Sequence, residues 1–340
     1  MKPKRTTIKD IAKHLGLSVS TVSRALNDSE NIKNETKELI REAACALNYQ
    51  SNPIGLSLKR GVTNTIGVLV PEMITPFASE VIFGIQKTLN KKRYKVIIAQ
   101  SDEDPVKECE NLRLMENFMV DGMIICPCDY KTNKKEYLRL KENGFSIVFY
   151  DRIPYGLDFP CVIVDDYRES FFMVEHLIRR GRKRIVYLQG PKYIYNSIER
   201  ARGYKDALNK FKIPFDPLLV IETGMNIDDG RKAAQELLKS KVKFDALFSF
   251  TETIALGAIN YLKYNKVRIP EEVAIASFSG TILSTIVYPQ LTSVEQPRET
   301  MGITAAELIL EKIENPNIAN KKVVLSSEIN FRASTDFPLS

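Results

Sequence analysis

Residues 6–27 read TTIKDIAKHLGLSVSTVSRALN, and this stretch decides the fold of the N-terminal part of the chain. Its first apolar residues fall at positions i, i+3, i+4 and i+7, the spacing of one helix face: Ile8, Ile11, Ala12 and Leu15. Gly16 follows at once and can adopt the positive φ that a tight turn needs. The stretch therefore predicts a short amphipathic helix that ends in a turn.

The residues around that turn are of the types that begin and end helices. Thr7 and Asp10 form a capping-box pattern before the first helix, and Ser18 can cap a second helix over about residues 19–27. A third helix is expected over roughly residues 35–47. Two short helices joined by a glycine turn and braced by a third form the helix-turn-helix arrangement.

Residues 52–61, NPIGLSLKRG, have the signals of one further, very short helix. Asn52 can cap it, Pro53 suits its first position, and Gly61 suits its end. A helix of about two turns is not stable alone in water. Gly55 weakens it by up to ~1 kcal/mol relative to alanine. We therefore expect this helix to form only when something holds it.

From Thr65 onward, apolar strand patterns alternate with amphipathic helix patterns. Strands are expected over residues 66–71, 94–99, 122–126, 185–188 and 246–250, and helices over about 77–91, 108–119, 200–211 and 229–239. Residues 120–124 recur in pattern as residues 244–248. The alternation predicts two βαβ halves with parallel sheets, and ligands of such folds bind at the carboxyl ends of the strands.

Composition sets broad limits on the class of protein. The chain of 340 residues is 44% apolar, which suits two or three globular domains. No apolar run approaches the ~18 residues of a membrane span, and the N-terminus lacks the apolar core of a secretory signal. We therefore expect a cytoplasmic protein with no membrane partner.

Cysteine and histidine usage argues against a metal or disulfide framework. Five cysteines, an odd number, fit reduced thiols, and Cys126-Pro127-Cys128 stands alone, so we interpret the pair as structural. The chain has two histidines, His14 and His176, far apart in sequence, which excludes a histidine-rich metal site.

The positive charge is concentrated at the N-terminus. The formal net charge is +7, from 49 basic and 42 acidic side chains. Residues 1–60 hold eleven of the basic side chains but six of the acidic ones, so the remaining 280 residues are close to neutral. A small basic module on a near-neutral body indicates a polyanion partner for the module alone.

Taken together, the order and spacing of these motifs resemble the LacI/GalR family of transcriptional repressors along essentially the whole chain. The resemblance is carried by residues 7–12, 18–27, Leu47-Asn48-Tyr49, Ser57-Leu58-Lys59, Ile66-Gly67-Val68, Pro76-Phe77, Asp102-Glu103-Asp104, Val120-Asp121-Gly122, Tyr150-Asp151-Arg152, Gly203-Tyr204, Ala255-Leu256-Gly257-Ala258, Pro289-Gln290-Leu291-Thr292 and Phe331-Arg332-Ala333-Ser334-Thr335.

The resemblance implies a domain plan and an assembly. An all-α helix-turn-helix headpiece covers residues 1–50 and a hinge covers 51–62. An α/β core of periplasmic-binding-protein type follows, with one subdomain of residues 63–160 and 293–321 and another of 161–292 and 322–340. Three crossings are expected near residues 161, 292 and 322. The family also implies a homodimer on a near-palindromic operator, with a tetramer as an alternative.

The resemblance also assigns the DNA contacts. Val19, Ser20 and Arg24 would face base edges, and Arg24 suits a bidentate contact to guanine. Phosphate contacts are expected from Thr7, Thr21, Ser23, Asn27 and Asn31. For Thr21, Ser23 and Asn27, the ordinary polarity of helix ends is the alternative. In the family, the leucine at Leu58 is wedged into the minor groove, and Lys59 beside it is a further expected contact.

For the core, the resemblance implies a small-molecule effector of sugar type, bound between the subdomains. The candidate contacts are Phe77, Asp151, Arg200, Phe248, Thr251, Glu252 and Ser279. Each has a plainer alternative: Phe77 packs at a helix start, Arg200 forms a structural salt bridge, and Asp151 only orients Arg152. Tyr155, Tyr193 and Tyr195 near the mouth would add stacking or only cover the surface.

Two positions depart from the family pattern. Many members have Asn-Asp where this chain has Thr251-Glu252, and many have aspartate where this chain has Ser279. A known sugar specificity therefore does not transfer. The departures leave open a modified or anionic sugar, or a protein co-regulator in place of a tight small effector.

Two other classes of protein fit less well. A transport sugar-binding protein would explain the core but not the helix-turn-helix. An enzyme is not expected, because no Gly-x-Gly-x-x-Gly follows a strand, no Gly-x-Ser-x-Gly occurs, and neither histidine lies in a triad-like context. No cofactor is expected.

Overall fold

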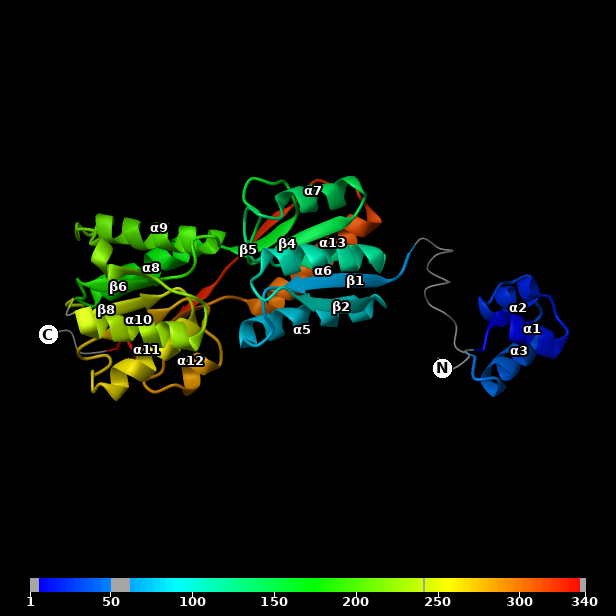
Figure 1. The fold of residues 1–340 in the computed structure, drawn as a ribbon, viewed down its shortest axis with the longest axis horizontal. Helices are drawn as coiled ribbons and strands as arrows, with labels where there is room; N and C mark the ends of the chain where they lie inside the picture. Colours follow the sequence, from blue (N-terminus) through cyan, green and yellow to red (C-terminus); the bar gives the residue numbers. More distant parts are fainter. Residues whose placement is uncertain (1–5, 50–61, 241, 337–340) are drawn as a thin grey trace. The chain divides into compact units, whose positions relative to one another are not determined.

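The computed structural model describes residues 6–49, 62–240 and 242–336. The chain divides into two compact units, residues 1–63 and residues 64–340, which we describe separately (Figure 1). Within the described residues, no helix is long and apolar enough to cross a membrane.

The N-terminal unit is a bundle of three helices. They are α1 (Ile8–Leu15), α2 (Val19–Leu26) and α3 (Asn34–Ala46). Each helix contributes buried side chains to one small core of Ile11, Ala12, Val22, Ala25, Ile40, Ala43 and Ala44. The predicted helix-turn-helix with a bracing third helix is confirmed.

The predicted ends of these helices are also found. The Asp10 carboxylate accepts hydrogen bonds from the Thr7 N–H at 2.8 Å and from its hydroxyl at 2.7 Å. Gly16 has φ of +62° and follows α1 directly. The Ser18 hydroxyl oxygen accepts from the Thr21 N–H at 3.0 Å and so caps α2. These local bonds fix the turn between α1 and α2.

The C-terminal unit, which we call the core, contains two lobes, each built on a six-stranded sheet. The first sheet is entirely parallel and has the order β11-β5-β4-β3-β1-β2. Its strands are β1 (Thr65–Val70), β2 (Lys95–Gln100), β3 (Gly122–Ile125), β4 (Ser146–Tyr150), β5 (Cys161–Val164) and β11 (Lys322–Leu325). One face packs against α5 (Pro76–Lys91) and α13 (Arg298–Glu314), and the other against α6 (Pro105–Asn117) and α7 (Lys134–Glu142).

The second sheet has the order β12-β10-β9-β8-β6-β7 and is parallel except for β12. Its strands are β6 (Ile185–Gln189), β7 (Val220–Glu222), β8 (Ala246–Ser249), β9 (Ala274–Ser277), β10 (Thr292–Glu295) and β12 (Glu328–Asn330). Helices α8 (Asp166–Arg179) and α9 (Tyr195–Lys210) cover one face, while α10 (Ile227–Ser240) and α11 (Glu252–Tyr264) cover the other (Figure 1). A one-turn helix, α12 (Leu283–Ile286), lies between β9 and β10.

The repeated sequence pattern corresponds to equivalent places in the two lobes. Residues 122–125 form β3 and residues 246–249 form β8, each beside the first strand of its own lobe. The aspartate before each strand donates its N–H to that neighbouring segment, Asp121 to Thr65 at 2.8 Å and Asp245 to Arg184 at 3.0 Å. The two halves are therefore built on one plan, as the sequence predicted.

The crossings between the lobes lie later in the chain than expected. Strands β5, β10 and β11 begin at or near residues 161, 292 and 322, and each completes its pairing before the chain leaves its sheet. The chain therefore crosses near residues 165, 296 and 326, after these strands. Each of these strands forms its hydrogen bonds within the sheet of the lobe that precedes the crossing. Each lobe boundary therefore lies one strand later than the sequence predicted.

Two helices begin earlier than the apolar periodicity indicated. Helix α6 begins at Pro105, three residues before the expected start, because Asp104 accepts from the Val106 N–H and proline suits the first helical position. Helix α9 begins at Tyr195, five residues before the expected start, so Arg200 lies inside the helix. Helices α7, α8, α11 and α13 were not among the expected elements.

Glycines allow unusually close contact between pairs of neighbouring helices. A Cβ atom on Gly84 of α5 would lie 2.2 Å from the carbonyl oxygen of Glu299, and one on Gly302 of α13 would lie 2.1 Å from that of Val81. Gly230 of α10 and Gly257 of α11 are placed in the same reciprocal way. These positions therefore require the absence of a side chain.

Candidate DNA-binding and ligand-binding sites

The exposed side of α2 carries the side chains expected to face DNA bases. Val19 is 45% exposed, and Ser20 and Arg24 are exposed as well, while Val22 and Ala25 on the opposite side are buried. The ion pairs of the described headpiece join Lys37 and Arg41 to Asp28, so Arg24 has no carboxylate partner there. An unpaired guanidinium on this face is available for a bidentate contact.

The expected phosphate contacts have mixed environments. Thr7, Asn27 and Asn31 are exposed, while Thr21 and Ser23 are half-buried. The Asn27 side-chain amide donates to the Ser23 carbonyl at 2.7 Å, which is the helix-end role weighed as the alternative. Leu58, Lys59 and the expected hinge helix lie outside the described residues.

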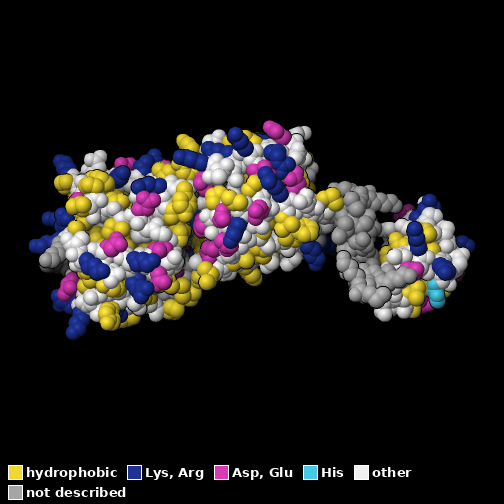
Figure 2. Space-filling model, in the orientation of Figure 1, with side chains coloured by type: hydrophobic (Ala, Val, Ile, Leu, Met, Phe, Trp, Pro, Cys, Tyr) yellow, Lys and Arg dark blue, Asp and Glu magenta, His cyan; other side chains and the backbone are white. Residues whose placement is uncertain are grey.

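The core carries charged side chains of both signs on the side drawn in Figure 2. Lysine and arginine side chains are interspersed there with aspartate and glutamate. This distribution agrees with the nearly neutral charge of residues 61–340.

A cavity of about 340 Å³ lies between the two lobes, at the carboxyl ends of the strands. Its first-lobe wall follows β1, β2 and β4, and its second-lobe wall follows β7, β8 and β9 and includes part of α9. Six of the seven expected effector contacts line it: Phe77, Asp151, Arg200, Thr251, Glu252 and Ser279. The structure therefore brings together residues that are up to 202 positions apart in the chain.

Phe248 is the exception. Its ring is fully buried and stacks on Tyr187 with 5.3 Å between the ring centroids, among residues that pack against α8 and α9. Phe250, two residues later, lines the cavity instead. Residue 248 lies within β8, whereas residue 250 lies just beyond its end, where the chain turns into the cleft.

Arg200 has the structural ion pair that was weighed as its alternative role. Its Nε donates to Asp166 at 2.7 Å and its Nη1 to the Phe250 carbonyl at 2.6 Å. The guanidinium also lies over the rings of Phe250 and Phe278, 4.5 Å and 3.6 Å from their centroids. Burial raises the pKa of Asp166 to about 7, although the charge of Arg200 lowers it. Arg200 thus supports the cavity wall while it lines the cavity.

Asp151 lies at the end of β4 with φ of +56°, and it is held from the opposite lobe. Its Oδ1 accepts from Gln296 Nε2 at 3.0 Å and from Asn196 Nδ2 at 3.5 Å. It does not orient Arg152, whose two terminal nitrogens instead donate to Glu103 at 2.7 and 2.8 Å.

Gln296 was not expected from the sequence. It lies where the chain crosses after β10, is 3% exposed, and also accepts a hydrogen bond from the Ser279 hydroxyl at 2.6 Å. One side-chain amide therefore bridges Asp151 of the first lobe and Ser279 of the second. Its position just after the crossing strand was the available signal, because polar side chains at crossings lie beside the cleft.

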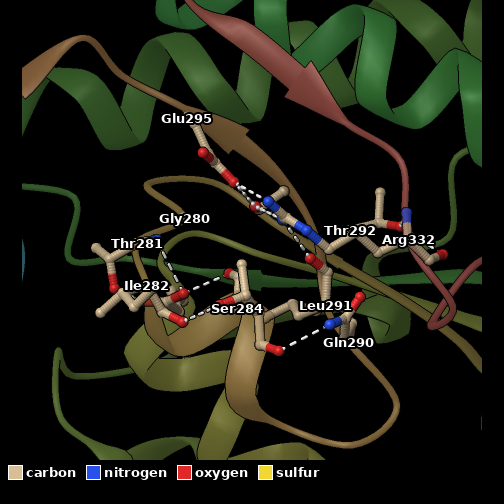
Figure 3. A network of polar contacts seen from close by, with 12 residues as sticks. Gly280, Thr281, Ile282, Ser284, Gln290, Leu291, Thr292, Glu295 and Arg332 are labelled. Carbon is tan, nitrogen blue, oxygen red and sulfur yellow. Dashed lines mark hydrogen bonds and ion pairs between the residues drawn. The ribbon is translucent and has the colours of Figure 1, made fainter.

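Glu252 begins α11 and fastens the loop that follows β9. Its carboxylate accepts from the Thr281 N–H at 2.9 Å, from the Thr281 hydroxyl at 2.5 Å, and from the Ser284 hydroxyl. At the other end of this loop, Arg332 donates to the Leu291 carbonyl and contacts Glu295, so both ends are anchored (Figure 3). Glu252 is 3% exposed and mainly shapes the cavity floor.

Thr251 has a different environment. Its hydroxyl oxygen is buried, and no described residue forms a hydrogen bond with it. It precedes α11 but makes no side-chain capping bond. A buried hydroxyl in a cavity wall costs free energy unless it is satisfied.

The three tyrosines expected near the mouth lie outside the lining of this cavity and contact residues across the lobes. The rings of Tyr155 and Tyr195 stack with 4.9 Å between centroids, and Tyr130 meets Tyr195 edge-on at 6.3 Å. The Tyr130 N–H also donates to the Tyr193 carbonyl at 3.2 Å. Of the two roles considered, covering the surface fits these contacts better.

Comparison with known proteins places both units in one family. Residues 63–335 match the periplasmic binding proteins and sugar binding domain of the LacI family, and residues 7–52 match bacterial regulatory proteins of the lacI family. The chain belongs to the LacI family of bacterial regulatory proteins, as its sequence motifs indicated.

Individual relatives cover nearly the full chain. The transcriptional regulator RegA of Clostridium saccharobutylicum is 31% identical and aligns over 97% of this chain and 99% of its own. Catabolite control protein A of Priestia megaterium is also 31% identical, over 97% and 99%. A solved transcriptional regulator CelR–cellobiose complex superposes with a TM-score of 0.74 at 25% identity, over 97% of this chain and all of the other. These relatives are transcriptional regulators and not enzymes.

Proposed function

We propose that this protein is a repressor that binds a near-palindromic operator as a homodimer and responds to a small effector in the cavity between its lobes. It would act in the cytoplasm, on DNA. Two headpieces related by twofold symmetry would read two half-sites of matching symmetry. The observation that carries the proposal is the exposed Arg24 on α2, which has no carboxylate partner among the described residues, in the same chain as a cavity between two lobes that is lined by polar side chains of both.

A sugar or sugar derivative is the effector that the cavity suits best. Phe77, which is partly exposed, supplies a flat apolar surface for a ring, while polar side chains from both lobes surround it. The solved relative named above holds cellobiose, which supports a carbohydrate ligand here. Because the wall comes from two lobes, a ligand that binds their two arrangements with different affinity would shift the operator affinity of the dimer.

The direct test is selection of operators from random DNA with the full-length protein, repeated with candidate sugars. We expect a site with inverted symmetry and a response of its affinity to at least one sugar. Recovery of sites without symmetry would contradict the dimer, and light scattering of the complex separates a dimer from a tetramer. Flat heats in calorimetry with every sugar would favour a protein co-regulator.

Arg24→Ala tests the base-reading role of α2. We expect the variant to lose preference at one base pair in each half-site, at a cost of about 1–3 kcal/mol, because a bidentate guanine contact is lost. Asn31→Ala, at an expected phosphate contact, is the matched control and should weaken binding to all sequences alike. An unchanged selection profile for Arg24→Ala would refute its role.

A further inference from the structure

The cavity between the lobes is lined by more negative than positive side chains. Five carboxylates take part in its lining, those of Glu72, Asp102, Glu103, Asp151 and Glu252, against the two guanidiniums of Arg152 and Arg200. A cleft lined by one sign of charge and walled by protein focuses its field on whatever enters it. The net negative charge of the lining therefore attracts cations and repels anions.

Both guanidiniums are already occupied. Arg152 uses its two terminal nitrogens on the Glu103 carboxylate, at 2.7 and 2.8 Å, and its side chain is 10% exposed. Arg200 is 3% exposed and pairs with Asp166, which does not belong to the lining of this cavity. An entering phosphate or carboxylate would have to compete with these pairs for positive charge.

Three of the carboxylates have neutral donors alone among the described residues. Glu72 accepts from the N–H groups of Ile74 and Thr75 and from the Thr75 hydroxyl. The donors to Glu252 are likewise an N–H and two hydroxyls. Their negative charges are therefore solvated by dipoles but not neutralised by a partner.

Asp151 is the best placed of the three to meet a ligand. It is half-buried and lines the cavity, whereas Glu252 is almost fully covered. Both of its side-chain hydrogen bonds, from Gln296 and Asn196, fall on Oδ1. Among the described residues no hydrogen bond falls on the second oxygen, Oδ2, and an ammonium group there would form a charge-assisted hydrogen bond.

We propose, on the basis of the effector site described above, that the cavity takes a polyhydroxyl ligand bearing a protonated amine, an amino sugar, and rejects the same sugar bearing a phosphate. The amine lies on Asp151 Oδ2, and the ring packs against Phe77. The anionic sugar that the sequence left open is disfavoured by the same charges.

Calorimetry with the full-length protein tests this through matched sets of probes. Each set contains a sugar, its 2-amino form and its 6-phosphate, built on glucose, galactose and mannose. In at least one set we expect the amino sugar to bind about tenfold more tightly than the parent and the phosphate to bind about tenfold more weakly. Equal affinity for amine and parent, a preference for phosphate, or no binding in any set overturns the proposal.

Two isosteric variants test which carboxylate makes the cavity prefer the amino sugar to the parent sugar. Asp151→Asn should reduce the ratio of amine to parent affinity about fivefold, and asparagine tolerates the positive φ at this position. Asp228→Asn is the matched control, because Asp228 is exposed, is paired with Arg231 at 3.0 Å and lies outside the lining of the cavity, and it should change the ratio less than twofold. Equal changes in the two variants would contradict the assignment to Asp151.

Operator selection distinguishes an error in the ligand class from an error in the proposed regulator function. If the protein selects a symmetric operator but shows no preference for the amine, the ligand class is wrong and the proposed regulator function stands. If no operator is selected, the proposed function fails, while the calorimetric ratios still decide the ligand class.

Discussion

Gln296 joins the two lobes through both ends of one side-chain amide. Its nitrogen donates to Asp151 and its oxygen accepts from Ser279, at 3.0 and 2.6 Å. Arg298, two residues later, spans the lobes in a similar way, since its Nε pairs with Glu80 of α5 at 2.8 Å and its Nη1 donates to the Gly280 carbonyl. Polar side chains at the second crossing thus hold the cleft edges at a defined separation.

His176 is a residue whose burial makes the stability of the core depend on pH. It lies on α8, its Nε2 is 3.0 Å from the Thr335 hydroxyl oxygen, and its ring stacks on Phe331. Burial lowers its pKa from 6.5 to about 4; the charge of Arg180 acts in the same direction and that of Asp336 opposes it. Below pH 6.5 the unfolded chain therefore binds a proton at this site that the folded core resists.

In the His176→Gln variant, stability should decrease less as the pH falls. The histidine's contribution to folding free energy is present above pH 6.5 and is lost as the pH falls from 6.5 toward 4. We expect the melting temperature of the wild type to fall by about 3 °C more than that of the variant between pH 7 and pH 4.5. His14→Gln, at an exposed site on α1, is the control. Parallel curves for wild type and His176→Gln would contradict the prediction.

The sequence located most cavity residues but not all their roles. Asp151, Thr251 and Ser279 could be placed because they follow strands whose carboxyl ends meet at one cleft. Phe248 was misplaced by two positions, since the exact end of β8 decides which aromatic ring turns into the cleft. The position of Gln296 after a crossing strand was a usable signal, but its two partners, like the Arg200–Asp166 pair, depend on contacts between distant segments that no local pattern reveals.

At the scale of elements, α5 and α13 pack as closely as backbone atoms permit. Gly84 and Gly302 occupy reciprocal positions, each against a carbonyl oxygen of the other helix. The two helices contribute buried side chains to the same face of the first sheet. Because the close atoms belong to the backbone, the crossing has no flexible side chain that could move aside.

Gly302→Ala should therefore destabilise the core by about 2 kcal/mol, although alanine is the better helix former. Chemical unfolding of the full-length protein, followed by circular dichroism, measures the change. Glu307→Ala, at an exposed position of the same helix, should stay within about 0.5 kcal/mol of the wild type. A stabilised Gly302→Ala variant would show that the helices can separate at no cost.

The elements themselves were predictable where their pattern is local. The headpiece helices have their caps and apolar stripes within a few residues, and β1, β3 and β8 are short apolar runs. Helix α13 was missed because it is apolar on several sides and buried between a sheet and α5. The start of α6 was misjudged because its cap, and not its apolar stripe, sets the first turn.

At the scale of the whole molecule, the two units have separate hydrophobic cores. The core of the N-terminal unit consists of residues 11–44, and the buried clusters of the other unit begin at Ile66. A chain that starts at residue 64 should keep the thermal transition of the core within about 2 °C, and should keep its ligand binding, while losing operator binding. Loss of the cooperative transition on truncation would show that the units depend on each other to fold.

The three crossings also determine the order in which the protein can fold during its synthesis. The headpiece, complete by residue 49, can fold as soon as it leaves the ribosome. The first lobe has to wait for α13 and β11, which end at residues 314 and 325, and the second lobe has to wait for β12 at residues 328–330. Both lobes thus close almost together, once residues 325–330 have been made, and a shorter nascent chain would present a finished DNA-binding headpiece with no finished sensor to control it.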